Sequence, residues 1–146
     1  MQEAQLLDSL LGRMIREAAT LEMYLERLVK QLCDSPYGAL LISGESSSRV
    51  LAACRALVDA RDDICATEKD EFRTLIVQAK QAFERRHRYV HGAIAWGAES
   101  KGIMRSRRLK AEHQFELADL EDLSALCVEF NRPVIVAHER LGKLIS

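Results

Sequence analysis

The sequence predicts an all-α fold: an up-down bundle of four to five helices, with room for a small β-hairpin before the last helix. Only two prolines and seven glycines interrupt a chain rich in Ala, Leu, Glu and Arg, residues that favour helix. Apolar residues also recur at helical spacing over long segments. Because 146 residues suit one domain around one core, we expect residues 1–146 to form a single helical domain.

The first helix is predicted over residues 2–33, where apolar residues step by four and three from end to end. The members of this stripe are Leu7, Leu11, Met14, Ala18, Leu21, Leu25, Leu28 and Leu32. The segment 34–36 (Asp-Ser-Pro) should end the helix, because proline lacks the N–H that the next turn needs. Residues 37–42 predict one or two further helical turns. The long stripe also suits a seam between helices, within the bundle or between subunits.

Two more helices are predicted in the middle of the chain. One covers residues 48–61, because the three serines at 46–48 offer N-caps directly before an apolar-periodic run. The next should begin behind Thr67 as its cap, with Asp70 in the place of the second capping-box residue. We expect it to continue to about Ala95.

The apolar stripe of this third helix contains a charged residue. Its apolar members are Phe72, Ile76, Ala79, Phe83 and Val90, and Arg86 falls between the last two. An arginine in such a row must be paired, face a cleft or lie at an interface. Glu22, in the first helix, is one carboxylate that could pair with it. Violations of pattern like this one occur at functional sites.

The segment between the third and last helices contains strand-like stretches. Residues 103–109 and 113–117 could pair as a small hairpin. The last helix is predicted over residues 120–144 with Asp119 as its cap. Pro133 lies inside this helix and should kink it or divide it in two.

The cysteines and the apolar runs indicate a cytoplasmic protein. Cys33, Cys54, Cys65 and Cys127 form no C-x-x-C pair and lie in apolar, helix-like contexts, so we expect buried free thiols in a reducing compartment. The N-terminal residues lack the basic and apolar regions of a signal peptide. No apolar run approaches the ~20 residues that a membrane span needs.

Charge is distributed unevenly along the chain. The formal net charge is −1, yet residues 80–110 hold nine Lys or Arg and only two acidic residues, a local net charge of +7 against −8 for the remainder. Such a segment can attract an anionic partner while the whole protein stays close to neutral. A solvated basic face without a partner is the alternative interpretation.

The basic segment contains the octapeptide Arg-Arg-His-Arg-Tyr-Val-His-Gly at residues 85–92. Four residues separate Arg86 from His91, and His87 directly follows the arginine. This arrangement resembles the R-x4-6-H motif of HEPN domains, small helical bundles of which many are metal-independent ribonucleases. The resemblance extends over most of the chain in helix order, but only over residues 86–92 in sequence. Other pairs have similar spacing: Arg85/His91, Arg107/His113, Arg108/His113 and Arg132/His138.

The resemblance implies roles for the residues of the motif. Cleavage of RNA without a metal uses the ribose 2′-OH as nucleophile, so a base must take its proton and an acid must protonate the leaving 5′ oxygen. We predict His91 as general base or acid, and Arg86 as the ligand of the scissile phosphate. His87 would orient that phosphate or assist proton transfer. Arg85 and Arg88 are predicted to bind flanking phosphates of the RNA.

A single copy of the motif presents an incomplete site. Residues five apart on one helix point about 140° away from each other, so Arg86 and His91 would face different directions. Either Gly92 bends the helix, or two copies meet about a two-fold axis, as the composite dimer sites of HEPN ribonucleases do. We therefore expect a homodimer that needs no cofactor or metal. The resemblance implies a toxin or phage-defence effector, with RNA as target and an antitoxin as a candidate partner.

Other interpretations of the same residues stay open. His87 and His91 have the spacing of a zinc-binding pair on a helix, although the neighbouring arginines would repel a cation. Tyr89 and Trp96 are expected in the core, with stacking on RNA bases as the alternative. The main alternative function is a non-catalytic HEPN-like module that binds RNA, a nucleotide or a partner protein.

Overall fold

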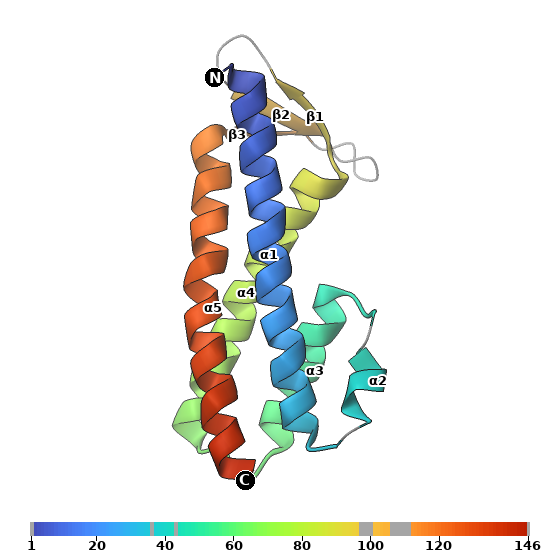
Figure 1. Cartoon of the computed structure of the whole chain (residues 1–146), viewed down its shortest axis with the longest axis vertical. Helices are drawn as coiled ribbons and strands as arrows, with labels where there is room; N and C mark the ends of the chain where they lie inside the picture. The colour runs from blue at the N-terminus through green and yellow to red at the C-terminus, as the bar shows by residue number, and fades with distance from the viewer. Residues whose placement is uncertain (1, 36, 43, 97–100, 106–111, 146) are drawn as a thin grey trace.

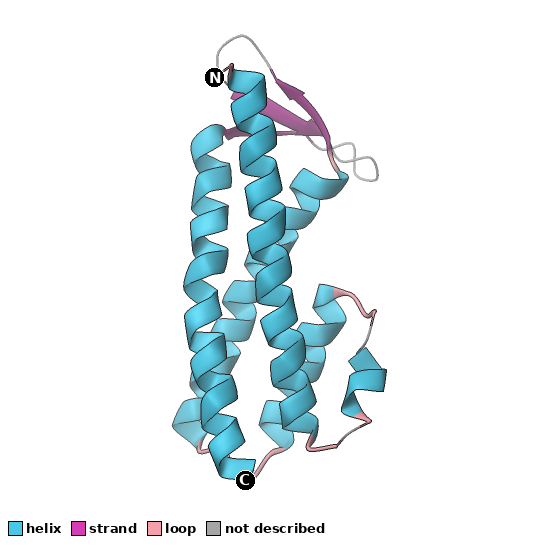
Figure 2. Cartoon of the chain, viewed as in Figure 1, coloured by secondary structure: helices cyan, strands magenta, loops and turns pink. Residues whose placement is uncertain are grey.

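The computed structural model describes residues 2–35, 37–42, 44–96, 101–105 and 112–145. Within these residues the chain is mostly helical, and a small antiparallel sheet precedes the last helix (Figures 1 and 2). The helices are α1 Glu3–Cys33, α2 Gly38–Ile42, α3 Ser47–Ala60, α4 Ala66–His91 and α5 Leu117–Ile145; the strands are β1 Ala93–Trp96, β2 Lys101–Arg105 and β3 Glu112–Glu116. The predicted helical fold is confirmed, but an all-α description omits the sheet.

The long helices α1 and α5 lie side by side and begin at the same end of the molecule (Figure 1). Helix α4 runs in the opposite direction and reaches the sheet with its C-terminal end. After α1, the segment that contains α2 leads back towards the middle of the molecule, so that α3 runs in the same direction as α1. An up-down order therefore describes the sequence from α3 to α5, but not the relation of α1 to α5.

The predicted stripe of α1 forms the centre of the core. Seven of its eight residues are buried, and Leu11 is partly buried. They pack with buried residues of α5, which are Leu120, Leu123, Cys127, Phe130, Val134 and Leu141. Each fully buried leucine contributes about 1.5–3 kcal/mol relative to an exposed one, so this contact between the two long helices is a major source of stability.

The helix starts differ in part from the prediction. Ser46 caps α3 as expected, since its side chain accepts a hydrogen bond from the N–H of Arg49. Thr67 is not a cap, because α4 begins at Ala66 behind Cys65.

Asp119 is not the N-cap of α5 either, because α5 begins two residues earlier, at Leu117. Its side-chain Oδ2 accepts from the N–H of Glu116 at 2.8 Å, which is the return half of a capping box. Pro133 lies inside a continuous helix, so of the two predicted effects, a kink or a division, the division does not occur.

Helix α4 ends at His91 rather than near Ala95. The N–H of Gly92 donates to the carbonyl of Arg88 at 2.8 Å and closes the helix. The chain then continues as β1, which pairs with β2, so the predicted extension was wrong because a tertiary strand pairing replaces it.

The sheet has three strands in the order β1-β2-β3, all antiparallel. The pairing of β2 with β3 confirms the predicted hairpin, whereas β1 was missed. Residues 106–109 of the predicted first strand lie outside the described residues, as do residues 110 and 111.

Phe115 of β3 joins the sheet to the bundle. Its ring lies over Gly102 of β2, where an added Cβ would come within 2.3 Å of ring atoms, so this position requires glycine. The ring of Tyr89 meets Phe115 edge-on at 5.3 Å between centroids, and the ring of Trp96 lies at 6.0 Å. The Nε1 of Trp96 donates to Glu3 at 3.2 Å. These contacts fix the end of α4, and with it the octapeptide, against the N-terminal turn of α1.

Candidate functional site

The buried side of α4 differs from the predicted stripe at its C-terminal end. Tyr89 is buried, while Val90 is 46% exposed. Tyr89 is buried in place of Val90 because Phe115, on the sheet, packs against the Tyr89 ring. The expectation that Tyr89 belongs to the core is confirmed, and its ring is not available to stack on a base. Trp96 is partly buried against the same phenylalanine.

Arg86 lies in a closed set of polar contacts between three helices. Its Nη1 donates to Glu22 Oε2 at 3.1 Å, and its Nη2 donates to Ser47 Oγ at 3.0 Å. The hydroxyl of Ser47 in turn donates to Glu22 Oε1 at 2.8 Å. The pairing of Arg86 with Glu22 that the sequence suggested is confirmed. Each member of this Glu22–Ser47–Arg86 triangle satisfies the other two and ties α1, α3 and α4 together.

The triangle is partly accessible to solvent. The side chains of Arg86 and Glu22 are 23% and 25% exposed, and the guanidinium also lies 5.1 Å from the centroid of the Phe83 ring, within the range of a cation–π contact. Sequence reasoning missed Ser47, because a run of three serines before a helix indicates capping. A helix needs only one cap residue, so two of the three serines were available for other contacts, and this surplus could have pointed to Ser47.

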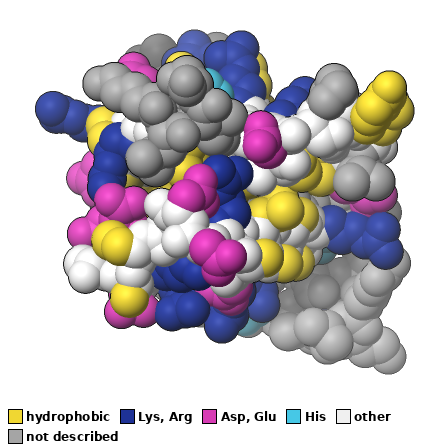
Figure 3. All heavy atoms as spheres, turned by 90° about the horizontal axis from the view of Figure 1, so that it is seen from below, with side chains coloured by type: hydrophobic (Ala, Val, Ile, Leu, Met, Phe, Trp, Pro, Cys, Tyr) yellow, Lys and Arg dark blue, Asp and Glu magenta, His cyan; other side chains and the backbone are white. Residues whose placement is uncertain are grey.

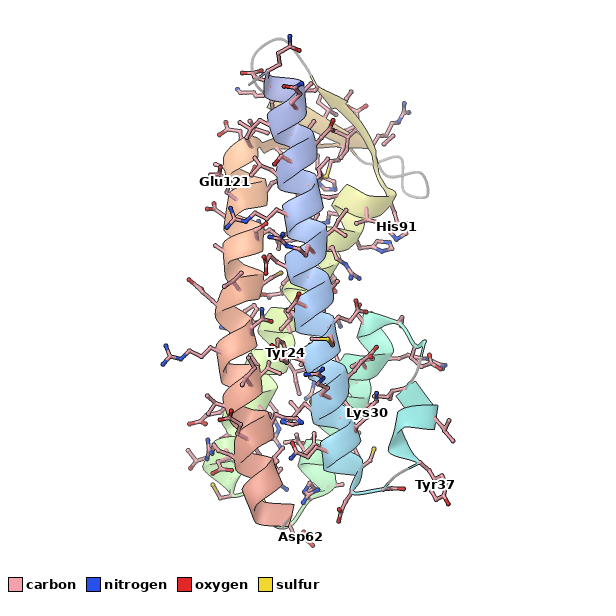
Figure 4. The ribbon with its side chains drawn as sticks, viewed as in Figure 1. Tyr24, Lys30, Tyr37, Asp62, His91 and Glu121 are labelled. Atoms are coloured by element: carbon pink, nitrogen blue, oxygen red, sulfur yellow. The ribbon has the colours of Figure 1, made fainter. Side chains whose placement is uncertain are left out.

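His87 and His91 form a pair on the outer side of α4. Their ring centroids are 4.4 Å apart, with the planes tilted by 44°. Both side chains are exposed, and within the described part of the chain neither imidazole hydrogen-bonds to another group. Figure 4 shows His91 at the C-terminal end of α4, pointing away from the bundle. The motif residues therefore fall into two environments.

The remaining arginines of the octapeptide also differ from each other. The Nη2 of Arg85 donates to the carbonyl of Asp119 at 3.3 Å, in a partly buried contact with the first turn of α5. Arg88 is exposed, and its side chain makes no hydrogen bond or ion pair among the described residues. Of the two predicted phosphate ligands, only Arg88 is exposed with no side-chain hydrogen bond or ion pair to another described residue.

Arg86 and His91 are not brought together within one chain. Because α4 stays helical to His91, the angle of about 140° between the two positions is kept. A bend at Gly92 comes after His91 and cannot reduce this angle. A site that uses both residues needs a second copy of the chain or another route by which substrate contacts both.

Burial and nearby charges shift three titratable groups in this part of the fold. Burial raises the pKa of Tyr89, and the Asp119 carboxylate raises it further, while Arg85 and Arg88 partly oppose the shift. Burial also raises the pKa of the Cys127 thiol, against an opposing effect of Arg86. In α3, burial raises the pKa of Cys54 to about 12. These two thiols stay protonated near neutral pH and are poor nucleophiles.

The four cysteines agree only in part with the expectation of buried thiols. Cys54 and Cys127 are buried, but Cys65 is exposed and Cys33 is partly exposed. Among the described residues, no three His, Cys, Asp or Glu side chains are grouped so that they could hold a metal ion. No helix in the described ranges combines the length and the apolar composition needed to cross a bilayer.

Part of the basic segment is exposed, on the second half of α4 and on β2 at the sheet end of the molecule. Lys80, Arg88, Lys101 and Arg105 are all exposed, and the rest of the basic segment, at 106–110, lies outside the described residues. Figure 3 views the molecule from the opposite end, where Lys and Arg side chains are interspersed with Asp and Glu. Exposed acidic residues also lie among the basic residues of α4 and β2, Glu84 on α4 and Glu112 and Glu116 on β3, so the described part of this region carries charges of both signs.

Comparison of the chain with models of protein families, with curated proteins and with solved structures finds no match. The HEPN resemblance rests on residues 86–92 and on the order of the helices.

Proposed function

We propose that the chain is a metal-independent endoribonuclease of the HEPN type, cleaving RNA through attack of the ribose 2′-OH at a composite dimer site. The observation that carries this proposal is the exposed His87–His91 pair, 4.4 Å between ring centroids, beside the exposed Arg88. Imidazoles change their protonation near neutral pH and serve as general acids and bases.

The proposed reaction is a transesterification within the RNA. His91 of one copy takes the proton of the 2′-OH, and the 2′ oxygen then attacks the adjacent phosphorus. The bond from phosphorus to the 5′ oxygen breaks, and an imidazolium protonates the departing oxygen. The products are a 2′,3′-cyclic phosphate and a free 5′-OH.

A dimer supports this chemistry better than one copy. The general base and the general acid must approach the phosphorus from opposite sides, because the 2′ oxygen enters in line with the departing oxygen. His87 and His91 project from one face of one helix and approach from the same side. A second copy across a two-fold axis can supply an imidazole from the other side.

Arg86 would act as a pre-oriented phosphate ligand. Its contacts with Glu22 and Ser47 occupy one donor on each terminal nitrogen, and the guanidinium keeps further N–H donors. Glu22 and Ser47 would hold the guanidinium plane so that little ordering is needed when phosphate binds. Arg88 would bind a flanking phosphate and contribute to the salt dependence of binding.

A second candidate function is a non-catalytic HEPN-like module that binds RNA, a nucleotide or a partner protein. The Glu22–Ser47–Arg86 triangle favours it, since an arginine whose main contacts are internal also serves stability alone. In this case the exposed histidines and Arg88 belong to a binding surface.

The test is incubation of the purified protein with labelled single-stranded RNA in the presence of EDTA. We expect wild type to produce fragments with 2′,3′-cyclic phosphate ends, and His91→Ala to lose at least 100-fold in rate. His113→Ala, a histidine on β3 outside the octapeptide, is the matched control and should cleave normally. An intact RNA panel after incubation with folded, dimeric wild type would reject the nuclease and leave the binding module.

Expression in a bacterial host tests the proposed biological role. As a toxin or phage-defence effector, the wild-type chain should arrest growth when induced, whereas His91→Ala should not. Equal growth of both strains at equal protein level would remove the toxin role.

A further inference from the structure

Helix α1 carries a second apolar row on the side opposite the core. Gly12, Ile15, Ala19 and Met23 step by three and four along the helix, and all four are exposed. The large members are well exposed, Ile15 to 46% and Met23 to 41%. A helix that is apolar on both faces has a second surface to bury, and within the described residues nothing covers this row.

Two charged residues at the ends of this row lie symmetrically about Ala19. Asp8 lies eleven residues before Ala19 and Lys30 lies eleven residues after it, and both are exposed. If two copies of α1 pair in antiparallel orientation about a two-fold axis at Ala19, Asp8 of each copy faces Lys30 of the other. Ile15 of each copy then faces Met23 of the other. In this register Asp8 and Lys30 are complementary in charge and Ile15 and Met23 in apolar contact, while Glu26 faces Gly12.

Two small residues of the row permit close approach. Ala19 lies on the two-fold axis, and Gly12 faces open space, since an added Cβ there would meet nothing within 4 Å. Small residues suit helices packed at about 8–10 Å with a crossing angle near 20°. At that angle, Asp8 and Lys30, about 16 Å from the axis, remain within reach of a lysine side chain.

We propose that two copies of this chain form a homodimer through the α1 row Gly12–Ile15–Ala19–Met23, antiparallel about Ala19. The two-fold axis runs perpendicular to both helices and keeps each flank of α1 on one side of the dimer. Glu22, on the flank next to the row, therefore brings both Glu22–Ser47–Arg86 triangles to the same side. The placement of both triangles on one side would contribute to a composite ribonuclease site, and this step rests on the proposed function. The dimer surface itself does not depend on that function.

The first test is the oligomeric state of purified variants by sedimentation equilibrium. Wild type should be dimeric, and Ile15→Arg should weaken the dimer at least 100-fold, because two arginines replace two apolar contacts. Val128→Arg is the matched control, since Val128 is exposed to a similar extent, 47%, on α5. It should leave the dimer unchanged. A monomeric wild type, or loss of the dimer in both variants alike, would overturn the proposal.

A charge reversal tests the register. Asp8→Lys should weaken the dimer about ten-fold, and the double variant Asp8→Lys with Lys30→Asp should restore it. Asp8 and Lys30 of one chain are 22 residues apart on one helix, about 33 Å, so they cannot restore each other within a copy. Absence of rescue would reject the register about Ala19.

A cross-link and a parallel cleavage assay complete the test. Ala19→Cys should form a covalent dimer on oxidation, and Ala125→Cys, exposed on α5, should not. Cleavage of RNA is measured on the same samples. A dimer with the predicted register but without cleavage would reject the ribonuclease and keep the interface. Cleavage that persists in monomeric Ile15→Arg would reject the composite site and keep the ribonuclease.

Discussion

The two sides of the last turns of α4 differ sharply, although the same octapeptide supplies both. On the inner side, Arg86 is held by Glu22 and Ser47, and Tyr89 is buried against Phe115. On the outer side, His87, Arg88 and His91 are exposed. A motif that is continuous in sequence is thus divided by the helical period into a part with internal contacts and a part open to ligand.

The inner and outer residues of the octapeptide should contribute to different properties, the inner ones to stability and the outer ones to ligand binding or catalysis. Residues with internal partners contribute to the free energy of unfolding whether or not the protein is an enzyme. Exposed residues without such partners contribute little to it, so a functional effect of changing them reports on ligand or catalysis. Stability and cleavage measured on the same variants therefore distinguish the two sides.

Tyr89→Ala should have the largest effect on stability. It removes a ring that is 7% exposed and in contact with Phe115, so we expect a loss of about 3–5 kcal/mol in the free energy of unfolding. His87→Ala, on the outer side, should change it by less than about 0.5 kcal/mol. Urea denaturation followed by circular dichroism measures both. Equal losses for the two variants would break the distinction between inner and outer sides.

Arg86→Ala should have an intermediate effect on stability. The change leaves Glu22 without its cation. Because the Arg86 and Glu22 side chains are about a quarter exposed, water can solvate Glu22 in part. The expected loss in the free energy of unfolding is about 1–3 kcal/mol. Arg88→Ala should cost less than about 0.5 kcal/mol. A double-mutant cycle with Glu22→Ala should return a coupling energy of about 1 kcal/mol. A coupling near zero would show that the Arg86–Glu22 contact contributes nothing to stability.

Ionisation of Tyr89 should have a smaller effect on stability than the substitutions above, and it should appear in the pH dependence of the free energy of unfolding. The folded state raises the pKa of this phenol, mainly through burial, so the native protein keeps a proton that the unfolded chain loses above pH about 10. The stabilising contribution is therefore complete below pH 10 and decreases as the pH rises further. The slope is at most about 1.4 kcal/mol per pH unit. Wild type should lose this stability relative to Tyr89→Phe as the pH rises above about 10, and parallel curves for the two proteins would contradict the assignment.

The helical part of the fold could be predicted because its signals are local and periodic. The stripe of α1 predicts its burial almost residue by residue, and the serine run before α3 contains the residue that caps it. Strand β1 could not be predicted in the same way. Residues 93–96 follow a strong helix without a breaker other than Gly92, and only their pairing with β2 makes them extended.

The candidate site was also predictable only in part. The residue types at 86, 87 and 91 indicate phosphate binding and proton transfer, and the pairing of Arg86 with Glu22 was suggested by the arginine in an apolar row. Ser47, the third member of the triangle, comes from a helix 39 residues away from Arg86 in sequence, and no local pattern marks such a contact.

The long helices, the core face of α1 and the basic octapeptide follow from local sequence alone, because helix period, capping and charge are properties of neighbouring residues. The tertiary structure decided which motif residues are held and which are open. Packing of β3 on α4 buries Tyr89 instead of Val90, and the meeting of α1, α3 and α4 gives Arg86 its partners. Contacts between distant segments depend on how the elements pack, and that packing assigns each side of α4 its environment.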